Sequence, residues 1–254
     1  MSIAILTYHQ IAEVPPHGTP LRALTVSPAD FRRQMAWMHR LGFRGLSMRD
    51  LMPYLRRERT GKVFGITFDD GFRNVHQHAM PVLDAFGFTA TNYFVSHQLN
   101  GTNVWDRELG VPDAPLMGVP EMREWARAGH EVGSHTLDHV HLPKVRPEEA
   151  LRQIVQSKHE LEQLLGDPVT AFCYPYGEQE PAHREMVKDA GYVSATLTQR
   201  GRASVSDDPF SLPRITVSSR SILRFLQKSL TRHEDIRRNS PREIRRKTDS
   251  SSLV

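Results

Sequence analysis

Short apolar runs alternate with longer segments of helical periodicity along most of this chain. The short runs have the length of β-strands, whereas the longer segments repeat apolar residues every three or four positions. The predicted strands cover residues 3–8, 43–46, 62–68, 88–95, 130–134, 169–174, 192–197 and 212–217. The predicted helices cover residues 28–41, 48–58, 74–86, 119–129, 147–165, 181–190 and 219–228.

Regular alternation of strand and helix is typical of a parallel sheet with helices packed on its outside. Seven or eight such units in one domain of this length predict an α/β fold with a closed or nearly closed (β/α) barrel. The longest helix opens at Pro147, and its buried stripe is predicted to consist of Leu151, Ile154, Val155, Leu161 and Leu165.

Two segments lack this periodicity. Residues 97–118 contain three glycines and two prolines and are predicted to form a long loop over one mouth of the barrel. Residues 231–254 have few apolar side chains and many charges, which predicts a disordered basic tail. The expected organisation is therefore one domain over residues 1–230 and a tail over residues 231–254.

Charge and cysteine content narrow the functional classes. The net charge of +4 arises entirely from the chain after residue 227, so the fold itself is neutral. We therefore expect no specific nucleic-acid partner, and at most weak contact of the tail with a membrane surface. The single Cys173 argues against a disulfide and a Cys-based zinc site. Without an apolar run of transmembrane length or a signal-peptide pattern, the expected location is cytoplasmic, with peripheral membrane contact as an option.

Two polar motifs follow the ends of predicted strands. Asp69 and Asp70 lie in the run Thr-Phe-Asp-Asp-Gly, and His135 and His139 lie in Gly-Ser-His-Thr-Leu-Asp-His. One Asp and two His form a three-ligand set that leaves a divalent cation an open position for water, while the second Asp can serve as a base. Each motif alone is also compatible with a polar turn or loop. Their combination indicates metal-assisted hydrolysis.

Other polar residues follow strands of the same pattern. His9 follows the first strand, Tyr176 lies in Tyr-Pro-Tyr-Gly after strand 169–174, and Arg214 lies near the last strand. The carboxyl ends of barrel strands converge on one face, so these residues are expected to share a site with the two motifs.

With these motifs the chain resembles the polysaccharide deacetylase family, the NodB-homology or carbohydrate esterase 4 group. The resemblance covers roughly residues 3–217 and extends to Gly-His-Glu-Val-Gly before the His motif. It implies a distorted (β/α)7-8 barrel of the NodB-homology type. It also implies hydrolysis of the N-acetyl amide of an amino sugar, in a glycan or a lipid-linked sugar.

Carried over by position, the resemblance implies that Asp69 is the general base and that Asp70, His135 and His139 are metal ligands. The backbone N–H of Tyr176 would help to hold the oxyanion. The donor set suits Zn²⁺ best, and Co²⁺, Ni²⁺ and Mn²⁺ remain alternatives.

The chain departs from the family pattern at two positions. Cys173 stands where many members carry an Arg that pairs with the base, and Arg214 replaces the late His that many members use as the acid. The opening Leu-Thr-Tyr-His-Gln-Ile instead resembles the branch of the poly-N-acetylglucosamine deacetylases, whose acid His comes from the N-terminal strand. We expect His9 to be the acid and Arg214 to supply the missing guanidinium to Asp69. Packing or strand-end roles are the alternatives for both residues.

Several residues and functions keep alternative interpretations. His141 is expected to lie in a solvated loop, and Trp105 either stacks on a sugar or anchors the long loop. A catalytically inactive carbohydrate-binding protein on the same fold is the alternative function. A third hypothesis is nucleic-acid or membrane binding through the basic tail.

Overall fold

The computed structural model describes residues 2–218 and 222–230. Its strands are β1 Ser2–Ile3, β2 Ile5–Tyr8, β3 Gln10–Ile11, β4 Thr25–Val26, β5 Arg44–Leu46, β6 Val63–Phe68, β7 Thr91–Phe94, β8 Glu131–Ser134, β9 Ala171–Cys173, β10 Ser194–Arg200, β11 Ala203–Ser204 and β12 Leu212–Thr216. Its α-helices are α1 Pro28–Arg40, α2 Met48–Leu55, α3 Met80–Phe86, α4 Val119–Arg127, α5 Pro147–Leu165, α6 Pro181–Asp189 and α7 Ile222–Leu230. The predicted tail at 231–254 lies outside the described residues.

Seven parallel strands close into a barrel in the order β2-β12-β10-β9-β8-β7-β6, and β6 pairs again with β2. The closing pair is in register from Ile5 opposite Gly65 to Tyr8 opposite Phe68. An eighth strand, β5, adds to the start of β6 and makes the barrel irregular. The predicted distorted barrel of seven or eight βα units is therefore confirmed.

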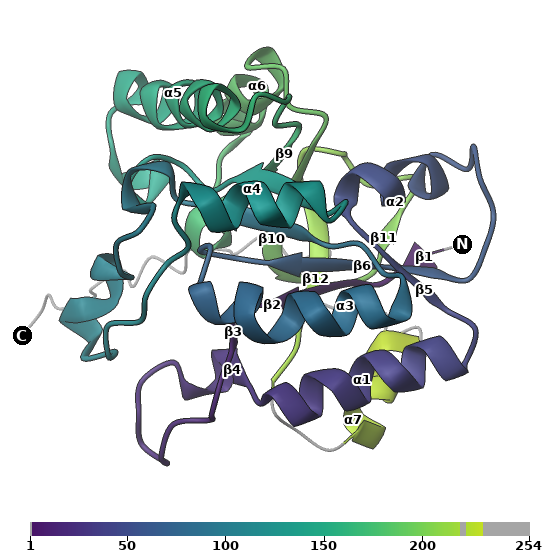
Figure 1. The fold of residues 1–254 in the computed structure, drawn as a ribbon. Helices are drawn as coiled ribbons and strands as arrows, with labels where there is room; N and C mark the ends of the chain where they lie inside the picture. The colour runs from purple at the N-terminus through teal and green to yellow at the C-terminus, as the bar shows by residue number, and fades with distance from the viewer. Residues whose placement is uncertain (1, 219–221, 231–254) are drawn as a thin grey trace, which may run out of the picture.

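The helices surround this sheet, as Figure 1 shows. Helices α5 and α6 pack together on one side, and α1 and α7 pack together on the opposite side. Helices α1 and α2 begin after serine N-caps. The Ser27 and Ser47 hydroxyls accept hydrogen bonds from the backbone N–H groups of Asp30 and Asp50. None of the described helices is long and apolar enough to cross a membrane.

The buried face of α5 agrees with the predicted stripe at Ile154 and Leu161 but not at Leu151 and Val155. Leu151 and Val155 are 44% and 43% exposed, whereas Ala150, Gln153 and Ile154 are buried. Gln153 replaces an apolar residue on the inner face because its Oε1 accepts the backbone N–H groups of Leu137 and Asp138. The hydrophobic pattern therefore identified part of the buried face, and it was wrong where the polar Gln153 and Ser157 are buried in place of Leu151 and Val155.

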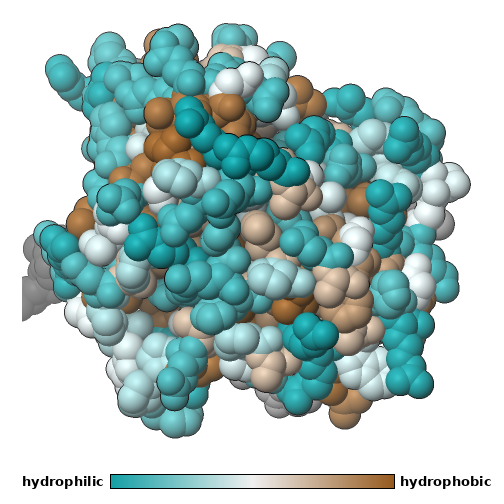
Figure 2. All heavy atoms as spheres, in the orientation of Figure 1, coloured by the Kyte–Doolittle hydropathy of each residue, from teal (hydrophilic) through white to brown (hydrophobic). Residues whose placement is uncertain are grey.

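The outer surface combines hydrophilic and hydrophobic residues, as expected for the solvent-facing sides of helices. The face seen in Figure 2 is mostly hydrophilic, with small groups of hydrophobic residues between the polar ones. The strands, by contrast, are buried along nearly their whole length. Buried strands and amphipathic helices are the expected division for a parallel barrel.

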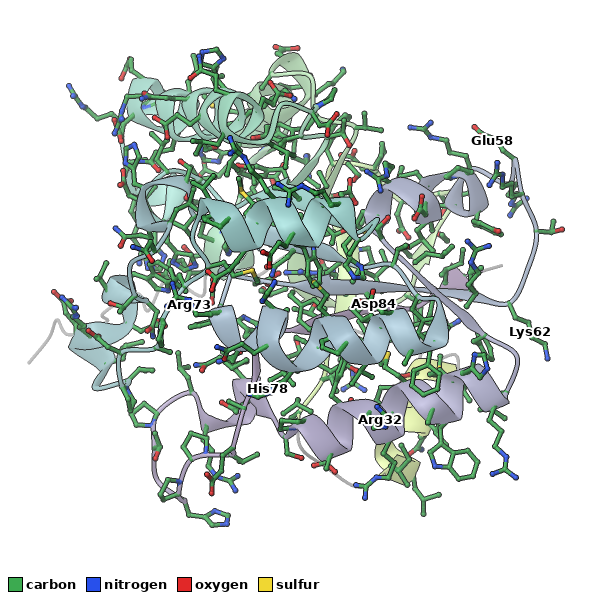
Figure 3. All side chains as sticks on the ribbon, in the orientation of Figure 1. Arg32, Glu58, Lys62, Arg73, His78 and Asp84 are labelled. Carbon is green, nitrogen blue, oxygen red and sulfur yellow. The ribbon has the colours of Figure 1, made fainter. Side chains whose placement is uncertain are left out.

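Residues 97–118 have more order than the predicted loop. They contain the 3₁₀ helices Ser96–Gln98 and Val104–Leu109, with isolated bridges at Phe72–Leu116 and Thr102–Pro115. Arg73, labelled in Figure 3, forms an ion pair with Glu121 at 2.9 Å and donates to Asn100 Oδ1. The segment is thereby fixed beside the carboxyl end of β6.

Candidate active site

Strand β6 delivers Asp69 and Asp70, and β8 delivers His135, to the same end of the barrel. Asp70 Oδ1 lies 3.5 Å from His135 Nε2 and 3.4 Å from His139 Nε2. All three side chains are buried, and their ligand atoms lie within 4.8 Å of one another. The structure therefore brings together the three residues that were expected to bind a metal.

The state of these groups fits a divalent cation. His135 Nδ1 lies 2.7 Å from the Cys173 carbonyl oxygen, which can only accept, so Nδ1 carries a proton and Nε2 is the ring atom that faces Asp70. Burial lowers the pKa of His139, which keeps its ring in the neutral, ligating form. Burial opposes ionisation of Asp70, but hydrogen bonds with His135 and His139 outweigh it and hold its pKa well below the ordinary value.

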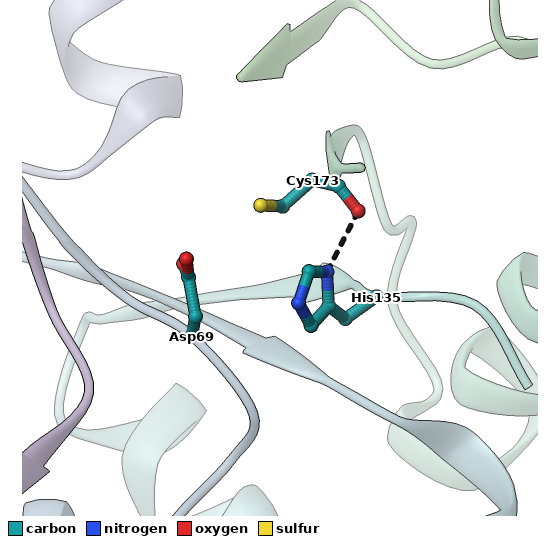
Figure 4. Close-up of side chains that lie close together, drawn as sticks. All are labelled: Asp69, His135 and Cys173. Carbon is teal, nitrogen blue, oxygen red and sulfur yellow. Dashed lines mark hydrogen bonds between the residues drawn. The ribbon is translucent and has the colours of Figure 1, made fainter. Parts of the chain in front are cut away.

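A second donor group shares His135. Asp69, His135 and Cys173 also place their ligand atoms within 4.8 Å, and Figure 4 shows the three side chains around one point. The Arg214 guanidinium lies 2.7 Å from Asp69 and 3.1 Å from Cys173 Sγ, so it already supplies positive charge there. The Asp70 set is the better cation site for this reason. Because the chain has a single cysteine, the sequence argued against a Cys-based zinc site. Cys173 nevertheless belongs to this second candidate metal group.

Asp69 is held by Arg214 in a bidentate pair. Arg214 Nη1 donates to Asp69 Oδ1 and Nη2 donates to Oδ2, both at 2.7 Å. Burial raises the pKa of Asp69, but the Arg214 charge and hydrogen bonds outweigh it, and the net pKa is lowered. The carboxylate therefore remains ionised and fixed in orientation at neutral pH.

The guanidinium of Arg214 has its own support inside the barrel. Its Nε donates to the Leu197 carbonyl oxygen at 2.8 Å, and the group lies over the Tyr93 ring at 5.8 Å. Tyr93 has room because residue 133 is glycine, and a Cβ at Gly133 would come within 2.4 Å of the ring. Arg214 is 1% exposed. An arginine in β12 thus reaches the β6 carboxylate across the barrel.

His9 enters the site from β2. Its Nε2 lies 3.9 Å from Asp69 Oδ2, and its side chain is 17% exposed. Its Nδ1 is buried and has no hydrogen-bond partner among the described residues. The ring therefore lies beside the carboxylate pair but keeps access to the space in front of it.

Tyr176 lies in a turn after β9, as predicted, but the strained backbone of this turn was not predicted. Its φ is +59°, a left-handed conformation that non-glycine residues rarely adopt. Its ring packs edge-on to His139 and stacks flat on His141, with ring centroids 3.7 Å apart. His141 Nδ1 is in turn 2.8 Å from Glu178 Oε2. The His141 side chain is 33% exposed in its loop, so the expected solvated loop is found, but its ring also stacks on Tyr176.

The long segment between β7 and α4 also reaches the site. Trp105 stacks on the His139 ring at 4.4 Å with an angle of 20° between the ring planes, so it covers a metal-ligand candidate. Asp106 is buried beside it. Sequence reasoning assigned no role to Asp106 or Glu178, and the only available signal was their closeness to Trp105 and Tyr176 along the chain.

A cavity of about 230 Å³ opens in front of these residues. His9, Asp70 and Asp106 line its inner end. Its outer walls come from residues 15–25 on one side and residues 111–114 on the other. A small-molecule group in this cavity can therefore contact His9 and Asp70, one member of the Asp-His-His set.

The chain matches a family model described as polysaccharide deacetylase over residues 56–195. It is 27% identical over 218 residues to the Bacillus subtilis (strain 168) protein YxkH, whose name assigns it to the same family, covering 85% of this chain and 71% of that protein. It is 22% identical over 231 residues to the poly-β-1,6-N-acetyl-D-glucosamine N-deacetylase of Staphylococcus epidermidis, covering 86% of this chain and 80% of that enzyme.

The fold is similar to that of the solved Streptococcus pyogenes deacetylase PplD in complex with acetate. The TM-score is 0.79 at 26% sequence identity, and the match covers 91% of this chain and 99% of that chain. The similarity thus extends over nearly all the described residues and includes the strands that carry the site.

Proposed function

Because this chain belongs to the polysaccharide deacetylase family, we propose that it hydrolyses the N-acetyl amide of an amino sugar and releases acetate. The observation that carries the proposal is the convergence of Asp70, His135 and His139 within 4.8 Å, next to the Asp69–Arg214 pair. A ligand set and an ionised carboxylate side by side at the end of a cavity are what amide hydrolysis requires.

The Asp70, His135 and His139 side chains would hold one divalent cation, and Zn²⁺ suits this donor set best. Such a cation supplies Lewis acidity to the amide oxygen and lowers the pKa of a water molecule. The hydrogen bond from His135 Nδ1 to the Cys173 carbonyl fixes that ring for binding.

The other residues divide the proton transfers. Asp69 would accept a proton from the attacking water, and the bidentate bond with Arg214 keeps its carboxylate in place. His9, 3.9 Å from Asp69, would donate a proton to the amine nitrogen as the C–N bond breaks. The backbone N–H of Tyr176 would donate to the developing oxyanion.

We place the chain in the branch whose acid comes from the N-terminal strand. His9 follows β2, which lies between β6 and β12 in the closed barrel and so stands next to both Asp69 and Arg214. The similarity to the staphylococcal poly-β-1,6-N-acetyl-D-glucosamine N-deacetylase supports this placement. We propose an N-acetylated glycan or a lipid-linked amino sugar as the substrate.

The test is release of acetate from N-acetylated oligosaccharides and lipid-linked sugars, with and without dipicolinate. We expect turnover that chelation abolishes and Zn²⁺ restores, and we expect Asp69→Asn to keep its metal while kcat falls by roughly 10²–10⁴. Full activity in a protein shown to be metal-free by elemental analysis would refute the metal-dependent mechanism. Sugar binding without any acetate release would favour the inactive carbohydrate-binding protein instead.

A further inference from the structure

Asp106 is a buried carboxylate that the proposed reaction does not use. It lies on the 3₁₀ helix Val104–Leu109 and is 7% exposed. Asn103 Nδ2 donates to its Oδ2 at 3.2 Å, and Asn103 Oδ1 accepts the backbone N–H of Ala114 at 2.7 Å. Because Asn103 is itself buried and fixed by the backbone, it holds the Asp106 carboxylate in one orientation.

No ion pair neutralises this carboxylate within the part of the chain that the structure describes. A carboxylate accepts several hydrogen bonds, and Asp106 receives one from the protein. Burial of an unpaired charge is costly, so such groups are normally paired or neutralised. Burial and the nearby Asp70 charge accordingly raise the pKa of Asp106. A positively charged group that contacted Asp106 would remove this cost.

The carboxylate lies in the cavity that leads to the reacting centre. It lines this cavity together with His9 and Asp70, but it does not belong to either candidate metal group. The cavity has a volume of about 230 Å³ and is also lined by residues between 15 and 25 and by residues 111–114, so it extends beyond the reacting centre. Asp106 therefore lies where substrate atoms enter and is free to pair with them.

We propose that Asp106 binds the free ammonium group of an amino-sugar unit adjacent to the unit being hydrolysed, so that the enzyme prefers partly de-N-acetylated chains. This inference rests on the proposed function and adds a specificity-determining residue to it. A sugar hydroxyl could donate a hydrogen bond to Asp106 but would leave its charge uncompensated. An ammonium group both donates and neutralises, and only a chain that has already lost an acetyl group carries one.

The experiment compares a fully acetylated N-acetylglucosamine tetramer with a tetramer that has one free amine. We expect kcat/KM of the wild type to be about tenfold higher on the second tetramer, the size of one charge-assisted hydrogen bond. Asp106→Asn should remove the preference and keep the metal content. Glu108→Gln is the matched control, because Glu108 lies on the same 3₁₀ helix but is exposed. Higher salt should reduce the preference.

A binding measurement separates specificity from turnover. Calorimetry with the fully de-N-acetylated glucosamine tetramer and metal-free protein should show about tenfold weaker binding for Asp106→Asn and no change for Glu108→Gln. Equal wild-type rates on both tetramers would overturn this inference while leaving the deacetylase proposal intact. Equal losses on both tetramers, or loss of metal in Asp106→Asn, would also overturn it. Absence of acetate release from either tetramer would instead refute the proposed function.

Discussion

Two adjacent aspartates at the end of β6 have opposite surroundings. Asp69 faces the Arg214 guanidinium in a bidentate pair, whereas Asp70 faces two imidazole rings. The left-handed turn at Asp70, with φ +75°, begins directly after Asp69 and separates the directions of the two carboxylates. One sequence motif therefore supplies both a fixed carboxylate, which we propose as the base, and a candidate metal ligand.

His9 provides the sharpest prediction for a single residue. We expect His9→Ala to keep its fold and metal content but to lose about 10²-fold or more in kcat on an N-acetyl amine, because the departing amine needs a proton. The kcat of His9→Ala on an activated aryl acetate should fall much less, since the phenolate leaves without protonation. The measurement is steady-state kinetics on both substrates, alongside elemental analysis of each variant.

His17→Ala is a suitable control for that experiment, because His17 is exposed in the loop that follows β3. It should behave as the wild type on both substrates. If His9→Ala lost equal activity on the amide and the ester, His9 would be a positioning residue and not the proton donor.

Spacing and strand ends predicted that one of the two aspartates would meet both histidines at the candidate metal site, and the choice of Asp70 came from the family resemblance. Asp70, His135 and His139 lie in short motifs whose register is fixed by β6 and β8. The place of His141 and Asp106 was not predictable in this way. Their positions depend on a strained turn and a 3₁₀ helix, and neither has a periodic pattern.

Secondary-structure elements were predicted well where an apolar pattern existed. All eight predicted strands overlap strands of the barrel, and all seven predicted helices overlap helices. Leu151 and Val155 were wrongly placed on the buried face of α5, because the buried Gln153 accepts the backbone N–H groups of Leu137 and Asp138, a contact that hydrophobicity cannot reveal. The segment at 97–118 was predicted as a loop because its short helices and bridges depend on contacts with Phe72 and Arg73.

The turn after β9 gives a prediction at the scale of an element. The His141 ring stacks on Tyr176 and opposes relaxation of its left-handed backbone, a conformation that costs roughly 1–3 kcal/mol. We expect His141→Ala to lower kcat/KM about tenfold, and His141→Phe, which keeps a stacking ring, to stay within about threefold of the wild type. Metal content should be unchanged in both variants.

The exposed His159 on α5 offers a control, since His159→Ala removes an imidazole that is remote from the turn. An equal loss in His141→Phe and His141→Ala would show that the bond to Glu178, and not the stack, positions Tyr176.

At the scale of the whole molecule, barrel closure creates the site. The N-terminal strand β2 pairs with β12 on one side and β6 on the other, so His9, Arg214 and Asp69 become neighbours although they are far apart in sequence. The alternation of strands and helices predicted the barrel. The alternation alone did not predict that a β12 arginine would cross to the β6 carboxylate, and the expectation that Arg214 pairs with Asp69 came from the family resemblance.

The buried ligand set also couples metal binding to the stability of the barrel. A cation that binds the folded chain and not the unfolded one stabilises it by about 2.7 kcal/mol at 100 times its Kd. For a domain of this size that corresponds to a rise in Tm of roughly 5–10 °C. Thermal unfolding should therefore show this rise with Zn²⁺ over dipicolinate in the wild type and in Asp69→Asn, and little rise in His135→Ala. An equal rise in His135→Ala would place the stabilising ion elsewhere.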